Sequence, residues 1–107
     1  MESSPAPTAI VCGNDVLAFG ALFEAQHLGL VVPRDVSIVG FDDLELASHL
    51  QPPLTTVQVP AESMWQRAAD HVLALLDGQE PQPNSEIEVS LVVRGSTAPP
   101  LGERGRR

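Results

Sequence analysis

Two pairs of polar residues each come directly after a short apolar run, and they are the residues of this chain best suited to binding a polar ligand. Asn14 and Asp15 follow the run AIVCG, and Asp42 and Asp43 follow the run SIVGF. Charged carboxylates accept strong hydrogen bonds from hydroxyl groups, as a sugar or another polyol would need. Carboxylates are also the ligands that Mg²⁺ prefers. From residue types alone, a sugar site and a metal site are both open.

The segments that carry these pairs predict a strand, a helix and a second strand. The runs at 9–13 and 37–41 are short, apolar and rich in β-branched residues. The helix between them begins at the capping residues Asn14 and Asp15 and ends at Gly29. Short loops make this a βαβ unit with parallel strands. Because ligands bind beyond the carboxyl ends of parallel strands, we expect both polar pairs to line one rim.

The rest of the chain predicts a loop, two further strands and a second helix. Pro60 stands where a helix can begin, and the residues after it have apolar side chains at helical spacing. The expected elements are a loop at 42–53 with a short helical turn near residues 44–49, a strand at 54–59, a helix at 61–77 and a last strand at 87–95. We therefore expect a flexible N-terminus at 1–8, one domain at 9–97 and a disordered tail at 98–107.

Composition narrows the classes of function. The chain of 107 residues has 14 acidic residues against six arginines and no lysine, for a net charge of −8. Such a charge argues against binding the phosphate backbone of a nucleic acid directly. Cys12 is the single cysteine, which excludes an internal disulfide and a cysteine-based metal cluster. No apolar run is long enough to span a membrane, and the first residues lack a secretion signal, so we expect a cytoplasmic protein.

We expect no enzyme and no cofactor. The serines form no nucleophile elbow, and the three histidines have no suitably spaced partners. One enzymatic alternative stays open, a Mg²⁺-dependent phosphotransferase or hydrolase that would use Asp15 and Asp42.

The first helix is apolar nearly all round, which is unusual for a helix on one face of a sheet. Its large side chains include Phe19, Leu22 and Phe23, and its polar stripe is thin. One apolar face can pack on the sheet, but a second needs another cover. We therefore predict that the helix contributes to an interface between copies of the chain, as a homodimer or higher oligomer.

Three motifs together resemble the effector-binding core of LacI/GalR-family transcription regulators. They are PTAIVCGNDVLAFG (7–20), GLVVPRDVSIVGFDD (29–43) and PLTTV (53–57), and the resemblance covers about residues 7–97. It implies part of a type I periplasmic-binding-protein-like α/β fold, with a parallel βαβ unit, a crossover strand, a helix in the other lobe and a final strand. The effector, usually a sugar or a purine, binds between the lobes.

The resemblance also implies roles for individual residues. Asn14 and Asp42 match positions that bind effector hydroxyls, and Asp15 matches the partner of Asn14 and would cap the helix. From the residues themselves, Asp43 is expected to support the site, with another cap or a solvated acid as the alternative roles. The family's dimer interface uses the helix at 16–28 and the loop near 46–51. The expected interface residues are Phe19, Leu22, Phe23, Leu46 and Leu50.

The sequence contains no segment resembling the family's N-terminal DNA-binding headpiece. We therefore expect operator DNA to be a partner only through such a headpiece, a sugar to be the small-molecule partner, and no membrane contact. A periplasmic-type sugar-binding protein, which shares the fold, is the alternative binding module.

Overall fold

The computed structural model describes residues 6–80 and 86–104, and its elements follow the predicted order. The chain divides into two units: unit 1 comprises Met1–Gln58 and Leu91–Arg107, and unit 2 comprises Val59–Ser90. In chain order the elements are β1 (Ala9–Val11), α1 (Asp15–His27), β2 (Ser37–Val39), the 3₁₀ helix η1 (Glu45–His49), β3 (Thr56–Gln58), α2 (Ala61–Leu76), β4 (Ser90–Val92) and α3 (Leu101–Arg104).

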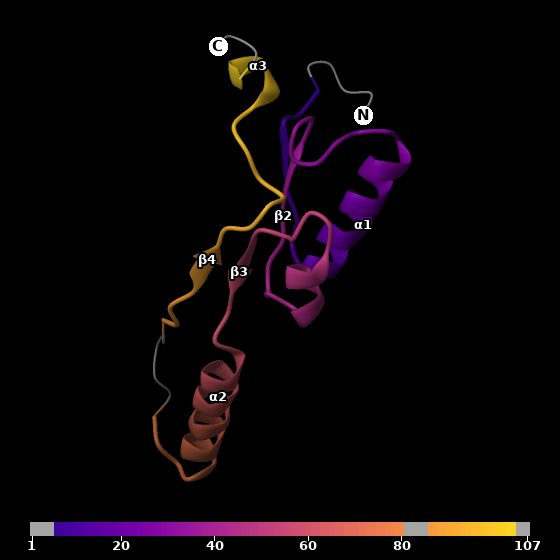
Figure 1. The fold of residues 1–107 in the computed structure, drawn as a ribbon. Helices are drawn as coiled ribbons and strands as arrows, with labels where there is room; N and C mark the ends of the chain where they lie inside the picture. Colours follow the sequence, from indigo (N-terminus) through magenta and orange to yellow (C-terminus); the bar gives the residue numbers. More distant parts are fainter. Residues whose placement is uncertain (1–5, 81–85, 105–107) are drawn as a thin grey trace. The chain divides into compact units, whose positions relative to one another are not determined.

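The predicted βαβ unit is confirmed. β1 and β2 pair in parallel with Ile10 opposite Ile38, and α1 connects them (Figure 1). Gly29 follows Leu28, the C-cap of the helix, and its φ of +82° suits a residue without a Cβ. The amide of Gly29 bonds to Gln26 O and that of Leu30 to Ala25 O, so the last carbonyls of α1 are satisfied.

β3 lies beside β2 on the edge opposite β1. Isolated parallel bridges join Val39 to Thr55 and Asp42 to Gln58, and β3 also pairs with β4. Next to them, Ser96 is completely buried. Its hydroxyl donates to Ile38 O (2.6 Å) and accepts from Thr55 N (2.8 Å). One small polar side chain thereby satisfies backbone groups of two neighbouring strands that would otherwise be buried without partners.

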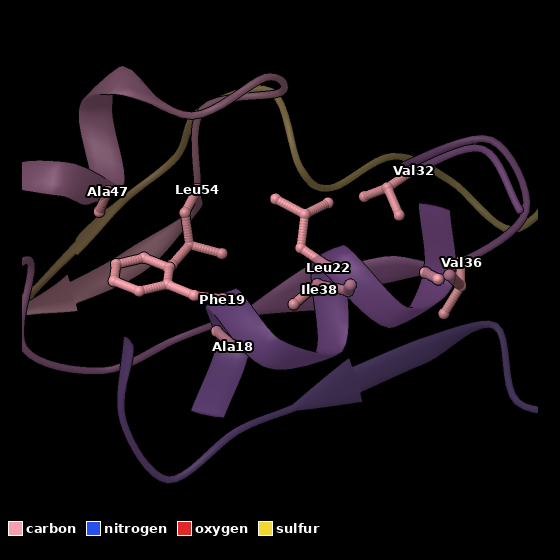
Figure 2. Close-up of a cluster of buried hydrophobic side chains, with 9 residues drawn as sticks. Ala18, Phe19, Leu22, Val32, Val36, Ile38, Ala47 and Leu54 are labelled. Atoms are coloured by element: carbon pink, nitrogen blue, oxygen red, sulfur yellow. The ribbon is translucent and has the colours of Figure 1, made fainter. Parts of the chain in front are cut away.

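The core of unit 1 lies between α1, β2 and the start of β3. Leu22, Ile38 and Leu54 are almost completely buried, and burying each contributes about 1.5–3 kcal/mol. Figure 2 shows Phe19 beside Ala47 and Leu54 at one end of this cluster, with Val32 and Val36 at the other. Because Ala47 belongs to η1, the core attaches the loop after β2 to the helix.

The structure differs from the sequence expectations at the ends of the chain and in the last strand. β4 is only Ser90–Val92, within the strand expected at 87–95. The flexible N-terminus expected at 1–8 includes Thr8, whose carbonyl accepts from Ser37 N, while residues 1–5 lie outside the described residues. In the expected disordered tail, Ala98 N donates to Ser37 Oγ and Leu101–Arg104 is one helical turn; residues 105–107 lie outside the described part.

Where one domain was expected at 9–97, residues Val59–Ser90 form a unit of their own. This is consistent with the expectation that the helix at 61–77 belongs to another lobe. α2 is amphipathic, yet it has no buried residue, and Trp65 and Leu76 are exposed. Within this unit Arg67 donates to Glu86 O.

Gly40 offers the sharpest test of this packing. A Cβ built there would clash with Asp15 Oδ1 and lie 2.9 Å from Leu54 Cδ2. We expect Gly40→Ala to lower the free energy of unfolding by about 2–3 kcal/mol or to prevent folding, because overpacking forces backbone and side chains apart. Urea unfolding measures the change.

Gly20→Ala is the matched control, since nothing lies within 4 Å of the added Cβ. It should stabilise α1 by about 0.5–1 kcal/mol, as alanine favours a helix interior over glycine. Two variants of equal stability would contradict the close approach of Gly40 to Asp15.

Candidate functional site

The residues that follow β1 and β2 come together at the carboxyl ends of these strands, as expected. Cys12 N donates to Val39 O (2.8 Å), and Asp15 N donates to Phe41 O (2.9 Å). The parallel register therefore continues past both strands. It places the start of α1 beside the loop that carries Asp42 and Asp43.

Asn14 is the N-cap of α1. Its Oδ1 accepts from Leu17 N at 2.8 Å, and its backbone is extended, as a cap residue requires. The side chain is half-buried. Because the cap uses the amide oxygen, the amide nitrogen with its two hydrogens is the group that Asn14 can offer to a ligand.

Asp15 is a fully buried carboxylate with both oxygens engaged. Oδ1 accepts from Thr56 Oγ1 (2.6 Å), and Oδ2 accepts from Leu44 N (2.7 Å). It also lies in the first turn of α1, where the helix dipole favours a negative charge. These contacts connect α1, the loop after β2 and β3.

Asp42 presents its side chain to solvent from a strained backbone. Its φ is +123°, a region that residues with a Cβ rarely adopt, and it is exposed. Its amide donates to Val57 O at 2.9 Å, so the main chain is held by β3. Strain of this kind costs about 1–3 kcal/mol and clusters at functional sites.

Asp43 is neither a cap nor a solvated acid, the two roles that sequence reasoning gave it besides ligand support. Its Oδ1 pairs with Arg94 Nη2 at 2.8 Å, and its Oδ2 accepts from Gln58 Nε2 at 3.1 Å. Only 12% of the Asp43 side chain is exposed. Its φ is +58°, so two consecutive residues of the loop have positive φ.

The expected interface residues divide into two groups. Phe19 and Leu22 are 9% and 1% exposed inside the core of unit 1, so placing them at an interface was wrong. They face the sheet because helical spacing sets them beside Ala18 and Ala25. Phe23 and Leu46 remain half-exposed, and Leu50 is partly buried against the core.

Part of the apolar surface of α1 is exposed. Besides Phe23, three large apolar residues of α1 and its C-cap are more than half exposed: Val16, Leu17 and Leu28. Part of the apolar surface of α1 is thus left exposed by unit 1, and its role in an interface stays a prediction.

Sequence reasoning missed the partners of the acids. Thr56 was read only as a strand former, yet its hydroxyl satisfies Asp15. Arg94 was read only as part of a strand, yet it satisfies Asp43. A single arginine at the end of an apolar strand is a signal for an acidic partner, but the sequence does not say which of the acids it is.

Metal and thiol chemistry find no support in the described geometry. Among residues 6–80 and 86–104, no group of three or more His, Cys, Asp or Glu side chains could hold a metal ion. Asp15, one of the two proposed Mg²⁺ ligands, has its oxygens already engaged. Burial raises the pKa of the Cys12 thiol, which disfavours the reactive thiolate.

The described helices include none long and apolar enough to cross a membrane. A hollow of about 600 Å³ lies in unit 1 away from the acidic loop. It is lined by Gln26, Gly29, Leu30, Val31, Val32, Pro33, Gln51 and Pro52. None of the four polar residues at the strand ends lines this hollow.

Comparisons with known proteins agree on one family. Residues 1–97 match the family described as the periplasmic binding protein-like domain. The chain is 52% identical over 101 residues to the HTH-type transcriptional regulator MalR of Streptomyces coelicolor, covering 92% of this chain and 29% of MalR. It is 41% identical over 92 residues to the HTH-type transcriptional repressor CytR of Escherichia coli, covering 85% of this chain and 27% of CytR.

Among solved structures, the lac repressor dimer bound to operator and the anti-inducer ONPF superposes with a TM-score of 0.78 at 41% identity. The match covers 85% of this chain and 32% of that one. The chain thus spans less than a third of the length of the curated relatives it matches.

The buried carboxylate gives a direct test of the site's support. Thr56→Val keeps the shape of the side chain but removes the donor to Asp15 Oδ1. We expect it to lower the free energy of unfolding by about 2–3 kcal/mol, because a buried charged acceptor loses its partner. Urea unfolding measures this loss.

Ser48→Ala serves as the control, since the exposed Ser48 hydroxyl donates only to Glu45 O. Its effect should stay within about 0.5 kcal/mol. A small and equal effect of both substitutions would show that Asp15 does not depend on Thr56.

Proposed function

The chain belongs to the periplasmic binding protein-like family, within the LacI/GalR group of transcription regulators, and we propose that its unit 1 forms one wall of a sugar-responsive effector site. The relatives are regulators rather than enzymes. The observation that carries the proposal is Asp42. Its exposed carboxylate stands at the carboxyl end of β2, on a main chain held at a φ of +123°.

Asn14 and Asp42 offer complementary groups to a sugar. The carboxylate of Asp42 accepts hydrogen bonds, and the amide nitrogen of Asn14 donates them. A sugar hydroxyl both donates and accepts, so neighbouring hydroxyls of one ring can use both side chains. Asp15 and Asp43 do not compete for the effector, because other groups of the protein already occupy their oxygens.

The regulatory mechanism we propose is a two-state change of the lobes. The effector binds one arrangement more tightly, and this difference in affinity sets the occupancy of the operator. The chain has a net charge of −8, which disfavours direct contact with DNA. We therefore assign DNA contact to a separate DNA-binding segment, which the HTH-type names of the relatives indicate for those proteins. This role places the protein in the cytoplasm.

We also propose that copies of the chain associate through the exposed apolar surface of α1, together with η1. Phe23 and Leu46 are 55% and 50% exposed, and they come from these two adjoining elements. Burial of such side chains is the main driving force of protein association. The similar solved structure of the lac repressor is that of a dimer.

Asp42→Gly separates strain from binding. Glycine adopts a φ of +123° freely, so we expect the variant to gain about 1 kcal/mol in free energy of unfolding. The same variant should lose effector binding. Thermal unfolding of the intact natural protein with glucose, galactose, maltose or lactose, and with adenosine for comparison, measures the second effect.

Asp42→Asn is the control, because asparagine keeps the size of the side chain but not its charge. It should lose sugar binding without the gain in stability. A sugar that stabilises the wild type and Asp42→Gly equally would refute the ligand role of Asp42, and stabilisation by adenosine alone would refute the sugar class.

Phe23→Glu tests the association surface. A charge placed on an apolar interface stays unpaired and costly, so we expect the oligomer to dissociate. Sedimentation velocity of the intact natural protein measures the change. Val93→Glu, at a residue of unit 1 that is 68% exposed and outside α1 and η1, should leave the oligomer intact. Unchanged sedimentation of Phe23→Glu would remove α1 from the interface.

A further inference from the structure

The carboxylate of Asp43 holds two side chains from distant parts of the sequence. Arg94 Nη2 donates to Oδ1 at 2.8 Å, and Gln58 Nε2 donates to Oδ2 at 3.1 Å. The ion pair is shielded from water, since 19% of the arginine side chain and 12% of the aspartate side chain are exposed. Shielding strengthens a charge pair relative to one at the open surface.

Two further hydrogen bonds hold Arg94 in place beside Asp43. Its amide donates to Thr55 Oγ1 (2.9 Å), and its Nη1 donates to Leu54 O (3.0 Å). A guanidinium group is a planar fork, so two donors directed at Leu54 and Asp43 fix its orientation. The start of β3 and the returning chain therefore form one support, from which the guanidinium holds the loop.

This support acts on the residue next to Asp42. The φ values of +123° and +58° at Asp42 and Asp43 require a strained main chain over two residues. Such a conformation persists only where its surroundings determine it. Asp42 N bonds to Val57 O, and Leu44 N bonds to Asp15 Oδ2, which hold the loop on both sides of Asp43. The side chain of Asp43 is the remaining anchor.

We propose that Arg94 is a positioning residue of the effector site, which orients the carboxylate of Asp42 through Asp43 without touching the effector. The proposal rests on the proposed function, in which Asp42 binds the effector. The proposal adds Arg94 to the residues of the effector site, although Arg94 lies 51 residues from Asp43 in the sequence. Its role depends on the ion pair with Asp43 and not on contact with the ligand.

The cluster also lies where the chain passes between the units. Gln58 is the last residue of unit 1 before unit 2, and Leu91 is the first residue after it. Asp43 thus contacts the outgoing connection through Gln58 and the returning connection through Arg94, three residues beyond the boundary. The geometry of the Asp42 loop is therefore tied to two segments of unit 1 that lie far apart in the sequence.

Amide hydrogen exchange by NMR on the full chain tests the proposal without a ligand. In Arg94→Met we expect the amides of Asp42 and Leu44 to exchange at least about tenfold faster, because the loop loses its anchor. The amides of Cys12 and Ser37, which bond within the β1–β2 region, should keep their rates. An equal acceleration at all four amides would indicate a general loss of stability and overturn a positioning role.

Two further variants make the result decisive. Arg34→Met is the matched control, since Arg34 pairs with Asp35 at 3.2 Å with 59% of its side chain exposed; it should change none of these rates. Arg94→Lys keeps the charge but cannot donate to Asp43 and Leu54 from one planar group. Arg94→Lys should accelerate hydrogen exchange at the amides of Asp42 and Leu44 selectively. If Arg94→Met does not fold, the exchange rates of Arg94→Lys test the positioning role instead. Unchanged exchange in Arg94→Lys would overturn the proposal.

A sugar titration then separates this inference from the proposed function. Calorimetry with glucose, galactose, maltose and lactose compares the intact wild type with Arg94→Lys and Arg34→Met. A sugar that binds the wild type should bind Arg94→Lys about tenfold more weakly and Arg34→Met equally well. Equal affinity for all three proteins would overturn the role of Arg94. If no sugar binds the wild type while the loop amides still accelerate, the sugar site fails and the support of the loop by Arg94 stands.

Discussion

The buried carboxylate of Asp15 is the interaction on which the rest of unit 1 depends. A charge removed from water is tolerated only when hydrogen bonds replace its hydration, and here Thr56 and the amide of Leu44 supply them. This requirement attaches β3 and the loop after β2 to the first turn of α1. It also explains why residue 40 has no side chain, since a Cβ there would meet the same carboxylate.

Three neighbouring acids have three different environments, although their side chains are chemically the same. Asp15 is buried and satisfied by neutral donors, Asp43 is shielded and paired with Arg94, and Asp42 is exposed on a strained main chain. Asp15 and Asp43 hold the loop in place, while the carboxylate of Asp42 stays exposed. Two of the acids therefore hold the loop, and the positive φ values fall on Asp42, which faces solvent, and on the shielded Asp43.

The helix α1 divides its apolar surface in a comparable way. Phe19 and Leu22 pack on the sheet, where they build the core, while Phe23 and Leu28 lie on sides of the helix that unit 1 leaves uncovered. Folding of unit 1 therefore accounts for only part of the all-round apolar sequence of α1. α2 in unit 2 is amphipathic as well, and none of its residues is buried.

The sequence by itself determined the order of the elements, the parallel βαβ unit and the place of the polar rim. Those features follow from local signals: apolar periodicity, the capping residue Asn14 and the closing Gly29. Only the tertiary structure decided which acid is buried, which is paired and which side of α1 is covered. Thr56 and Arg94 lie more than 40 residues from Asp15 and Asp43, at separations of 41 and 51 residues. Partners at such separations are chosen by how the chain folds back on itself, so no local pattern specifies them.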